Sequence, residues 1–157
     1  MHTRTVSLVQ ESFAKVQPIA VVASELFYAR LFELDPALKA LFRGDMNEQG
    51  HKLMTMLGIA VANLDKPEVV MPALRKLGER HVGYGVDDAH YVTVGAALLW
   101  TLEQGLGADF TAEVKAAWTD VYTLVADTMK AAAQHALTAE GQPGAEPTNG
   151  ATKSGLH

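Results

Sequence analysis

Hydrophobic residues recur every three or four positions along most of the chain, and this period constrains the fold more than any other feature. No stretch alternates convincingly between apolar and polar residues, which is the pattern of a half-buried strand. The chain is therefore predicted to be all-α. Its seven or eight unequal helices favour oblique packing over an up-and-down four-helix bundle, which uses fewer and longer helices.

Residues that break or cap helices give approximate bounds. Asp35-Pro36 and the Asp45–Glu48 spacing are typical helix starts. Pro72 is expected to break or restart the segment that begins near Pro67. The predicted helices cover 7–17, 18–34, 36–42, about 45–64, 67–83, 87–106 and 111–137.

The end of the chain has a different composition. Residues 139–157 are rich in Gly and Pro and almost free of large apolar side chains, so they are expected to form a disordered tail. The remaining residues, 1–138, are long enough to bury a sizeable core as one domain.

Composition excludes several kinds of site. The chain of 157 residues has no cysteine, which removes disulfides, thiolate metal sites and iron–sulfur clusters. Its net charge of −5 and lack of a basic stripe make nucleic-acid binding unexpected. The longest apolar run, 91–100, is about half of the ~20 residues that a membrane span needs. We expect a soluble, cytoplasmic protein with no membrane partner.

Three predicted helices each carry one polar side chain on an otherwise apolar face. His81 ends the face of Val70, Leu74 and Leu77, just before two glycines that stop the helix. Gln49 begins a face that continues through Leu53 and Leu57, and Tyr28 lies among Val21, Leu31 and Phe32. Taken singly, Tyr28 and His81 are more typical of hydrogen-bonded core residues than of ligands, Gln49 is typical of a first-turn residue at the edge of the core, and His81 could also cap its helix.

Other chemistries have little support in the sequence. There is no His-x-x-x-His or Glu-x-x-His pair for zinc or a di-iron centre, and no glycine-rich phosphate loop after a strand.

Several motifs agree in order and spacing over about residues 5–135. The segments "FYARLF", "DPALKALF", "QGHKL", "LGERHVGYGV" and "HYVTVG" together resemble the globins. The chain is similar to the single-domain bacterial haemoglobins and to the haem module of flavohaemoglobins. The resemblance implies a globin fold around a pocket for haem, expected to be b-type.

The resemblance assigns roles to residues on both sides of that pocket. His81 matches the proximal ligand of the haem iron, and the Leu77 carbonyl would accept a hydrogen bond from its other ring nitrogen. Phe42, Leu53, Leu77, Val86 and Tyr91 match further haem-contacting positions. Arg80 and Lys52 would reach the propionates, or else are ordinary solvated charges. Gly50 would let its helix approach the helix of Ser24.

Tyr28 and Gln49 match the distal residues that donate hydrogen bonds to a bound gas. These two donors predict tight, reversible dioxygen binding with slow release, together with binding of carbon monoxide and nitric oxide. The alternative is a nitric oxide dioxygenase that works with a separate reductase. The glutamate that supports the proximal histidine in flavohaemoglobins falls on Ala133, which favours simple binding. A third alternative is a globin fold that has lost haem and serves as an interaction module.

Overall fold

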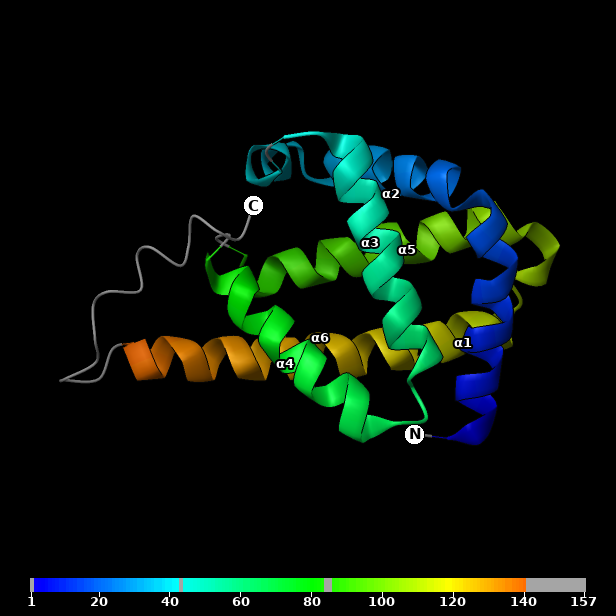
Figure 1. Cartoon of the computed structure of the whole chain (residues 1–157). Helices are drawn as coiled ribbons and strands as arrows, with labels where there is room; N and C mark the ends of the chain where they lie inside the picture. Colours follow the sequence, from blue (N-terminus) through cyan, green and yellow to red (C-terminus); the bar gives the residue numbers. More distant parts are fainter. Residues whose placement is uncertain (1, 43, 84–85, 141–157) are drawn as a thin grey trace.

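The computed structural model describes residues 2–42, 44–83 and 86–140, and in these residues it contains six α-helices, three short 3-10 helices and no strand (Figure 1). The expected tail falls largely on residues 141–157, which lie outside the described residues. The helices are α1 (Thr3–Val16), η1 (Gln17–Ile19), α2 (Ala20–Leu34), η2 (Pro36–Leu41), α3 (Met46–Ala62), α4 (Pro67–Gly83), α5 (Asp88–Leu106), η3 (Gly107–Asp109) and α6 (Ala112–Glu140).

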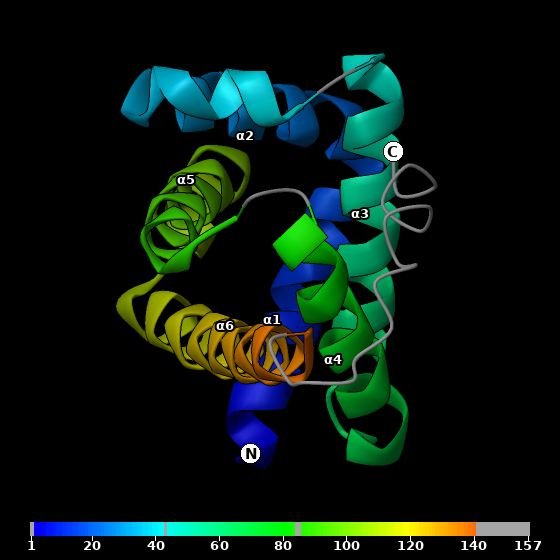
Figure 2. The ribbon, with the colours of Figure 1, turned by 90° about the vertical axis from the view of Figure 1, so that its left-hand side faces the viewer.

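The helices cross obliquely, as their number and unequal lengths predict. In Figure 1, α3 runs steeply across α5 and α6. The main packing partners are α4 with α6, α2 with α5 and α3, and α1 with α6. Figure 2 shows the C-terminal end of α4 between α3, α5 and α6, with α2 on the far side of α5.

The largest core cluster lies where α1 meets α6. Val6, Val9, Phe13 and Val16 follow helical spacing on α1 and are all buried. Trp118 of α6 is 1 % exposed, and its indole nitrogen donates to the Ser12 hydroxyl at 2.8 Å. That bond satisfies a polar group that would otherwise be costly to bury.

Most helix ends follow the local signals in the sequence. Asp45 caps α3 by accepting from the Asn47 N–H at 2.8 Å. Asp87 caps α5 in a reciprocal arrangement with His90, whose Nδ1 accepts from the Asp87 N–H at 3.0 Å.

The helices differ from the prediction at two prolines and in the type of one short helix. Pro72 neither breaks nor restarts its segment, because α4 continues through it. Its missing N–H would pair with the carbonyl of Glu68, in the first turn, so only one early hydrogen bond is lost. Pro18 lies in η1, so the second α-helix begins at Ala20 and not at Pro18. The short helix predicted at 36–42 is present as the 3-10 helix η2 (Pro36–Leu41) and not as an α-helix. The number of α-helices is therefore slightly below the seven or eight expected.

Two glycines let helices approach closely. A Cβ on Gly50 of α3 would lie 2.6 Å from the Ser24 hydroxyl of α2, which confirms the predicted close approach of these helices. A Cβ on Gly78 of α4 would overlap the backbone of Met129 on α6. The first contact holds together α2 and α3, which carry the candidates Tyr28 and Gln49. The second holds α4, which carries His81, against α6.

None of the described helices combines enough length and hydropathy to cross a membrane.

Candidate functional site

His81 lies in the last turn of α4, half-buried at the end of an apolar face. Its Nδ1 is 2.8 Å from the Leu77 carbonyl oxygen. Because a carbonyl can only accept, Nδ1 carries the proton and Nε2 is the unprotonated nitrogen. Burial lowers the pKa of His81, although the Leu77 hydrogen bond opposes the shift. The ring is therefore held neutral, in the form in which imidazole binds a metal.

The proximal wall around His81 comes from three helices. Leu77 and Val86 pack against a buried cluster that includes Leu74 of α4, Tyr91 of α5 and Met129 of α6. The Val86 N–H donates to the His81 carbonyl at 3.1 Å, which holds the chain close to the histidine just after α4 ends.

Tyr91 is buried, with 7 % of its surface exposed, and its hydroxyl has no hydrogen-bond partner among the described residues. Burial, with the nearby Asp88 carboxylate, raises the pKa of Tyr91, so the hydroxyl keeps its proton. The Lys130 ammonium lies 5.5 Å from the centre of the Tyr91 ring. The hydroxyl is therefore a buried donor without a partner among the described residues, and such groups are normally hydrogen-bonded.

Tyr28 and Gln49 come together although they are 21 residues apart. Tyr28 of α2 is buried, and its hydroxyl lies 3.4 Å from the Gln49 carbonyl oxygen in the first turn of α3. That is a long hydrogen bond. Burial raises the pKa of Tyr28 to about 12, which keeps this hydroxyl a donor as well.

Aromatic and aliphatic side chains surround Tyr28. Phe42, at the end of η2, meets the Tyr28 ring edge-on at 5.3 Å between ring centres, and Phe32 stacks on it at 6.0 Å. Leu53 of α3 packs against the same cluster. The distal candidates Tyr28, Gln49 and Leu53, with Phe42, thus form one continuous, largely apolar group.

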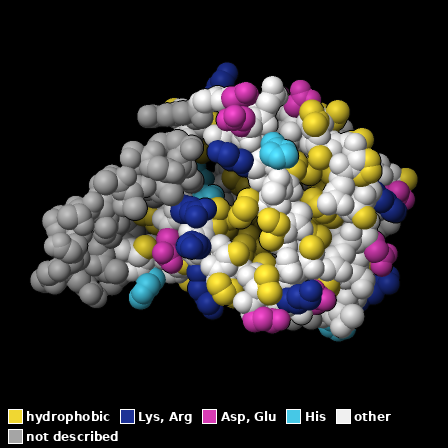
Figure 3. Space-filling model, viewed as in Figure 1, with side chains coloured by type: hydrophobic (Ala, Val, Ile, Leu, Met, Phe, Trp, Pro, Cys, Tyr) yellow, Lys and Arg dark blue, Asp and Glu magenta, His cyan; other side chains and the backbone are white. Residues whose placement is uncertain are grey.

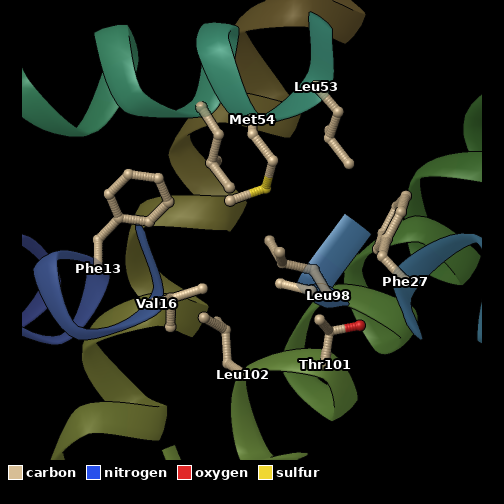
Figure 4. A pocket seen from close by; sticks show the side chains of 10 residues that line it. Phe13, Val16, Phe27, Leu53, Met54, Leu98, Thr101 and Leu102 are labelled. Carbon is tan, nitrogen blue, oxygen red and sulfur yellow. The ribbon is translucent and has the colours of Figure 1, made fainter. Parts of the chain in front are cut away.

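Leu53 also lines a small cavity of about 20 Å³ (Figure 4). It is lined by Phe13, Phe27, Leu98 and other side chains of the core, and the Thr101 hydroxyl beside it donates to the Ala97 carbonyl. A void of this size has room for about one water-sized molecule, so it is not a site for a large cofactor.

The charged candidates lie at the surface. Arg80 and Lys52 are both exposed, and so is His51, as its place on the outer side of α3 predicts. Hydrophobic side chains gather in the middle of the face drawn in Figure 3. On α3, the large apolar side chains of Met56 and Ile59 are exposed.

Comparison with known proteins decides the family. The family model for Globin matches residues 25–129, which include the candidate residues around both His81 and Tyr28. The chain belongs to the globin family. Family membership implies a haem cofactor. It also explains why the apolar face of α4 ends in a neutral histidine.

Two kinds of relative are similar to this globin. It is 33 % identical over 129 residues to a flavohemoprotein of Xylella fastidiosa strain Temecula1, an alignment that covers 80 % of this chain and 32 % of the relative. It is 30 % identical over 136 residues to neuroglobin-1 of Oncorhynchus mykiss, covering 78 % and 86 %. The globin thus spans about a third of the length of the flavohemoproteins that it matches.

A solved structure has the same fold. It is an engineered carbene transferase made from a candidate nitric oxide dioxygenase of Rhodothermus marinus, with a TM-score of 0.82 and 26 % sequence identity. The match covers 90 % of this chain and 99 % of that one.

The residues of this globin fit a haem group. His81 offers a neutral, oriented nitrogen at the end of an apolar face, and the Tyr91 hydroxyl is a buried donor without a partner among the described residues. Among the described residues no three His, Asp or Glu side chains gather as a metal cluster. A metal held by His81 would therefore need its other ligands from a non-protein group, as a porphyrin supplies.

Sequence reasoning missed two residues of the proximal side. Tyr122 and Lys130 of α6 both contact Tyr91. Tyr122 follows Trp118 and Val121 on an apolar face, so its position alone predicts only a core aromatic. The glycine at position 95, opposite Tyr122, is the one signal that could have pointed to a close contact.

Proposed function

We propose that this globin binds dioxygen reversibly at a b-type haem held by His81. The observation that carries the proposal is the meeting of the Tyr28 hydroxyl with the first turn of α3 at Gln49. Haem iron with one protein ligand supplies an open coordination position for a diatomic gas. Tyr28 and the side-chain amide of Gln49 would lie on the opposite side of the cofactor from His81.

The Tyr28 hydroxyl is suited to donate to a gas in this position. Its bond to the Gln49 carbonyl is long, so turning towards a ligand costs little. Its pKa of about 12 keeps it protonated throughout the physiological range. A bound dioxygen would be a partly negative acceptor for this hydroxyl, and a hydrogen bond to a charged group contributes about 1.5–3 kcal/mol.

The Phe42 ring and the Leu53 side chain would exclude water around the gas. Both pack against the aromatic cluster of Tyr28. We further propose that Leu77, Val86 and Tyr91 contact the haem from the proximal side. Arg80 and Lys52, which are exposed, are candidates for its propionates.

Replacing Tyr28 by Phe tests the proposal. The variant keeps the aromatic packing and removes only the donor, so the dioxygen release rate should rise about ten- to a hundred-fold, as a loss of 1.5–3 kcal/mol implies. Stopped-flow measurement of release gives the rate. Carbon monoxide serves as the internal control, because it carries less charge and its release should change less. An unchanged dioxygen rate would contradict the proposal.

Nitric oxide dioxygenation is the second candidate. It is supported by the flavohemoprotein relatives and by the Rhodothermus marinus protein of the same fold. The reaction joins dioxygen and nitric oxide with one electron to give nitrate, so a reductase must supply that electron. Ala133 of α6 stands where flavohaemoglobins carry the supporting glutamate, and residues 130–136 hold no carboxylate. We therefore place this candidate second.

Nitrate yield separates the two candidates. With nitric oxide, dioxygen and a flavin reductase present, a dioxygenase forms many nitrate molecules per protein at a steady rate. The reversible binder that we propose forms about one and stops with its iron oxidised. Sustained nitrate formation would replace the first proposal with the second.

A further inference from the structure

Lys130 of α6 places a positive charge on the proximal side of the molecule. Its ammonium lies 5.5 Å from the centre of the Tyr91 ring, and its side chain is half-buried. The preceding residue, Met129, is buried, and its backbone lies so close to Gly78 of α4 that a Cβ on the glycine would overlap it. This part of α6 therefore contacts α4 about one turn before His81 (Figure 2).

Tyr91 connects the Lys130 ammonium with the turn that holds His81. The Tyr91 ring belongs to the buried cluster against which Leu77 packs. The Leu77 carbonyl in turn accepts the hydrogen bond from the His81 ring. The positive charge is thus separated from the turn of the histidine by the width of one aromatic side chain.

No carboxylate neutralises Lys130 in the part of the chain that the structure describes. None of the ion pairs found there includes it, and residues 130–136 contain no Asp or Glu. Asp127, one turn earlier on α6, is exposed, and so is Asp88, whose carboxylate acts on Tyr91. Exposed charges are screened by water and salt, whereas a partly buried charge is screened less. The balance of charge next to Tyr91 is therefore positive.

We propose that Lys130 is an electrostatic determinant of the reduction potential of the bound haem, and that it favours the ferrous form. This inference rests on the proposed function, because it assumes that His81 binds the iron. Ferric haem carries one positive charge more than ferrous haem, so a fixed cation nearby disfavours it by Coulomb repulsion. Lys130 thereby raises the reduction potential and favours the oxidation state that binds dioxygen reversibly.

The test measures the reduction potential by spectroelectrochemical titration of the gas-free holoprotein. Lys130→Met removes the charge and keeps an unbranched stem that can cover the Tyr91 ring, so its potential should be lower than that of the parent. Lys130→Arg keeps the charge and should keep the parent's potential. Lys130→Glu reverses the charge and should lower the potential about twice as far as Lys130→Met, because the Coulomb energy is proportional to the charge.

Lys115→Met is the matched control on the same helix. Lys115 is exposed, and it precedes Lys130 by a stretch of α6 about 22 Å long. An exposed charge at this distance lies well beyond the screening length of about 8 Å at physiological salt, so this variant should keep the parent's potential. If Lys130→Met does not take up haem, Lys130→Gln replaces it as the neutral variant.

Three results would overturn the inference. They are the parent's potential in the neutral variant, an equally lowered potential in Lys115→Met, and a potential in Lys130→Arg as low as in the neutral variant. The last would assign the effect to packing and not to charge. Failure of the proposed function is distinguishable, because it appears in the parent itself, as sustained nitrate formation or as the absence of a reversible spectral change with dioxygen.

Discussion

At the scale of single residues, burial sets the protonation of the site. It lowers the pKa of His81 and raises the pKa of Tyr28 and Tyr91. All three side chains are therefore neutral near pH 7, with the histidine ready to bind a metal and the tyrosines ready to donate. Burial is the largest cause for each group, because a low-dielectric environment disfavours the charged form; for Tyr91 the Asp88 carboxylate adds to the shift.

The lowered pKa of His81 predicts a pH dependence of stability in the cofactor-free protein. The unfolded chain binds a proton at His81 near pH 6.5, whereas the folded chain resists it until a lower pH. The free energy of unfolding should thus fall as the pH drops from about 7 through the range just below 6.5, and this contribution should level off below the folded pKa. Urea unfolding at a series of pH values measures it.

A His81→Phe variant is the control for the pH profile. It keeps the other five histidines of the chain, so the difference between the two profiles isolates residue 81. Profiles that run parallel between pH 7 and pH 5 would show that His81 is not held neutral by the fold.

At the scale of helices, local signals predict ends well and internal continuity poorly. Asp45 and Asp87 cap α3 and α5 as expected, since a cap depends on a few neighbouring residues. Pro72 does not stop α4, because the packing of that helix against α6 outweighs the loss of one hydrogen bond. Whether a short segment such as 36–41 is α or 3-10 depends on contacts that the local sequence does not reveal.

The close contact of Gly50 with Ser24 predicts a cost for any larger residue. Gly50→Ala would place a Cβ 2.6 Å from the Ser24 hydroxyl and 3.0 Å from its Cβ, forcing α3 away from α2. Overpacking of this kind costs about 1–3 kcal/mol. Urea unfolding should show the loss, and adding Ser24→Gly should recover part of it.

Gly58→Ala is the control on the same helix. Its nearest neighbour is Phe13 at 3.7 Å, so a Cβ fits, and alanine is favoured over glycine by about 1 kcal/mol within a helix. This variant should be neutral or more stable than the parent. Equal losses for Gly50→Ala and Gly58→Ala would mean that the helix approach at Ser24 is not the cause.

At the scale of the whole molecule, the site joins residues that are distant in sequence. Periodicity identifies His81, Gln49 and Tyr28 as polar members of apolar faces, but it does not show that the three helices share one pocket. The resemblance to globins supplies that relation. The contact of Tyr122 with α5 could not be predicted from the sequence, because it depends on the Tyr91 backbone carbonyl and on the space that Gly95 leaves for the ring.

Binding of haem should stabilise the whole fold by mass action. A ligand at a hundred times its dissociation constant adds about 2.7 kcal/mol to the free energy of unfolding if the unfolded chain does not bind it. Thermal unfolding of the reconstituted protein measures the gain. Iron-free protoporphyrin is the control, because it fills the same apolar space without a bond to His81 and should stabilise less. Equal stabilisation by both would argue against an iron–His81 bond.

The central claim, that His81 binds haem iron, is tested most directly by the absorption spectrum of a His81→Ala variant reconstituted with haem. We predict that the variant loses the ferrous spectrum of the parent and its shift with carbon monoxide, and that added imidazole restores them by filling the space of the missing ring. A variant that takes up haem and gives the parent's spectra without imidazole would contradict the claim.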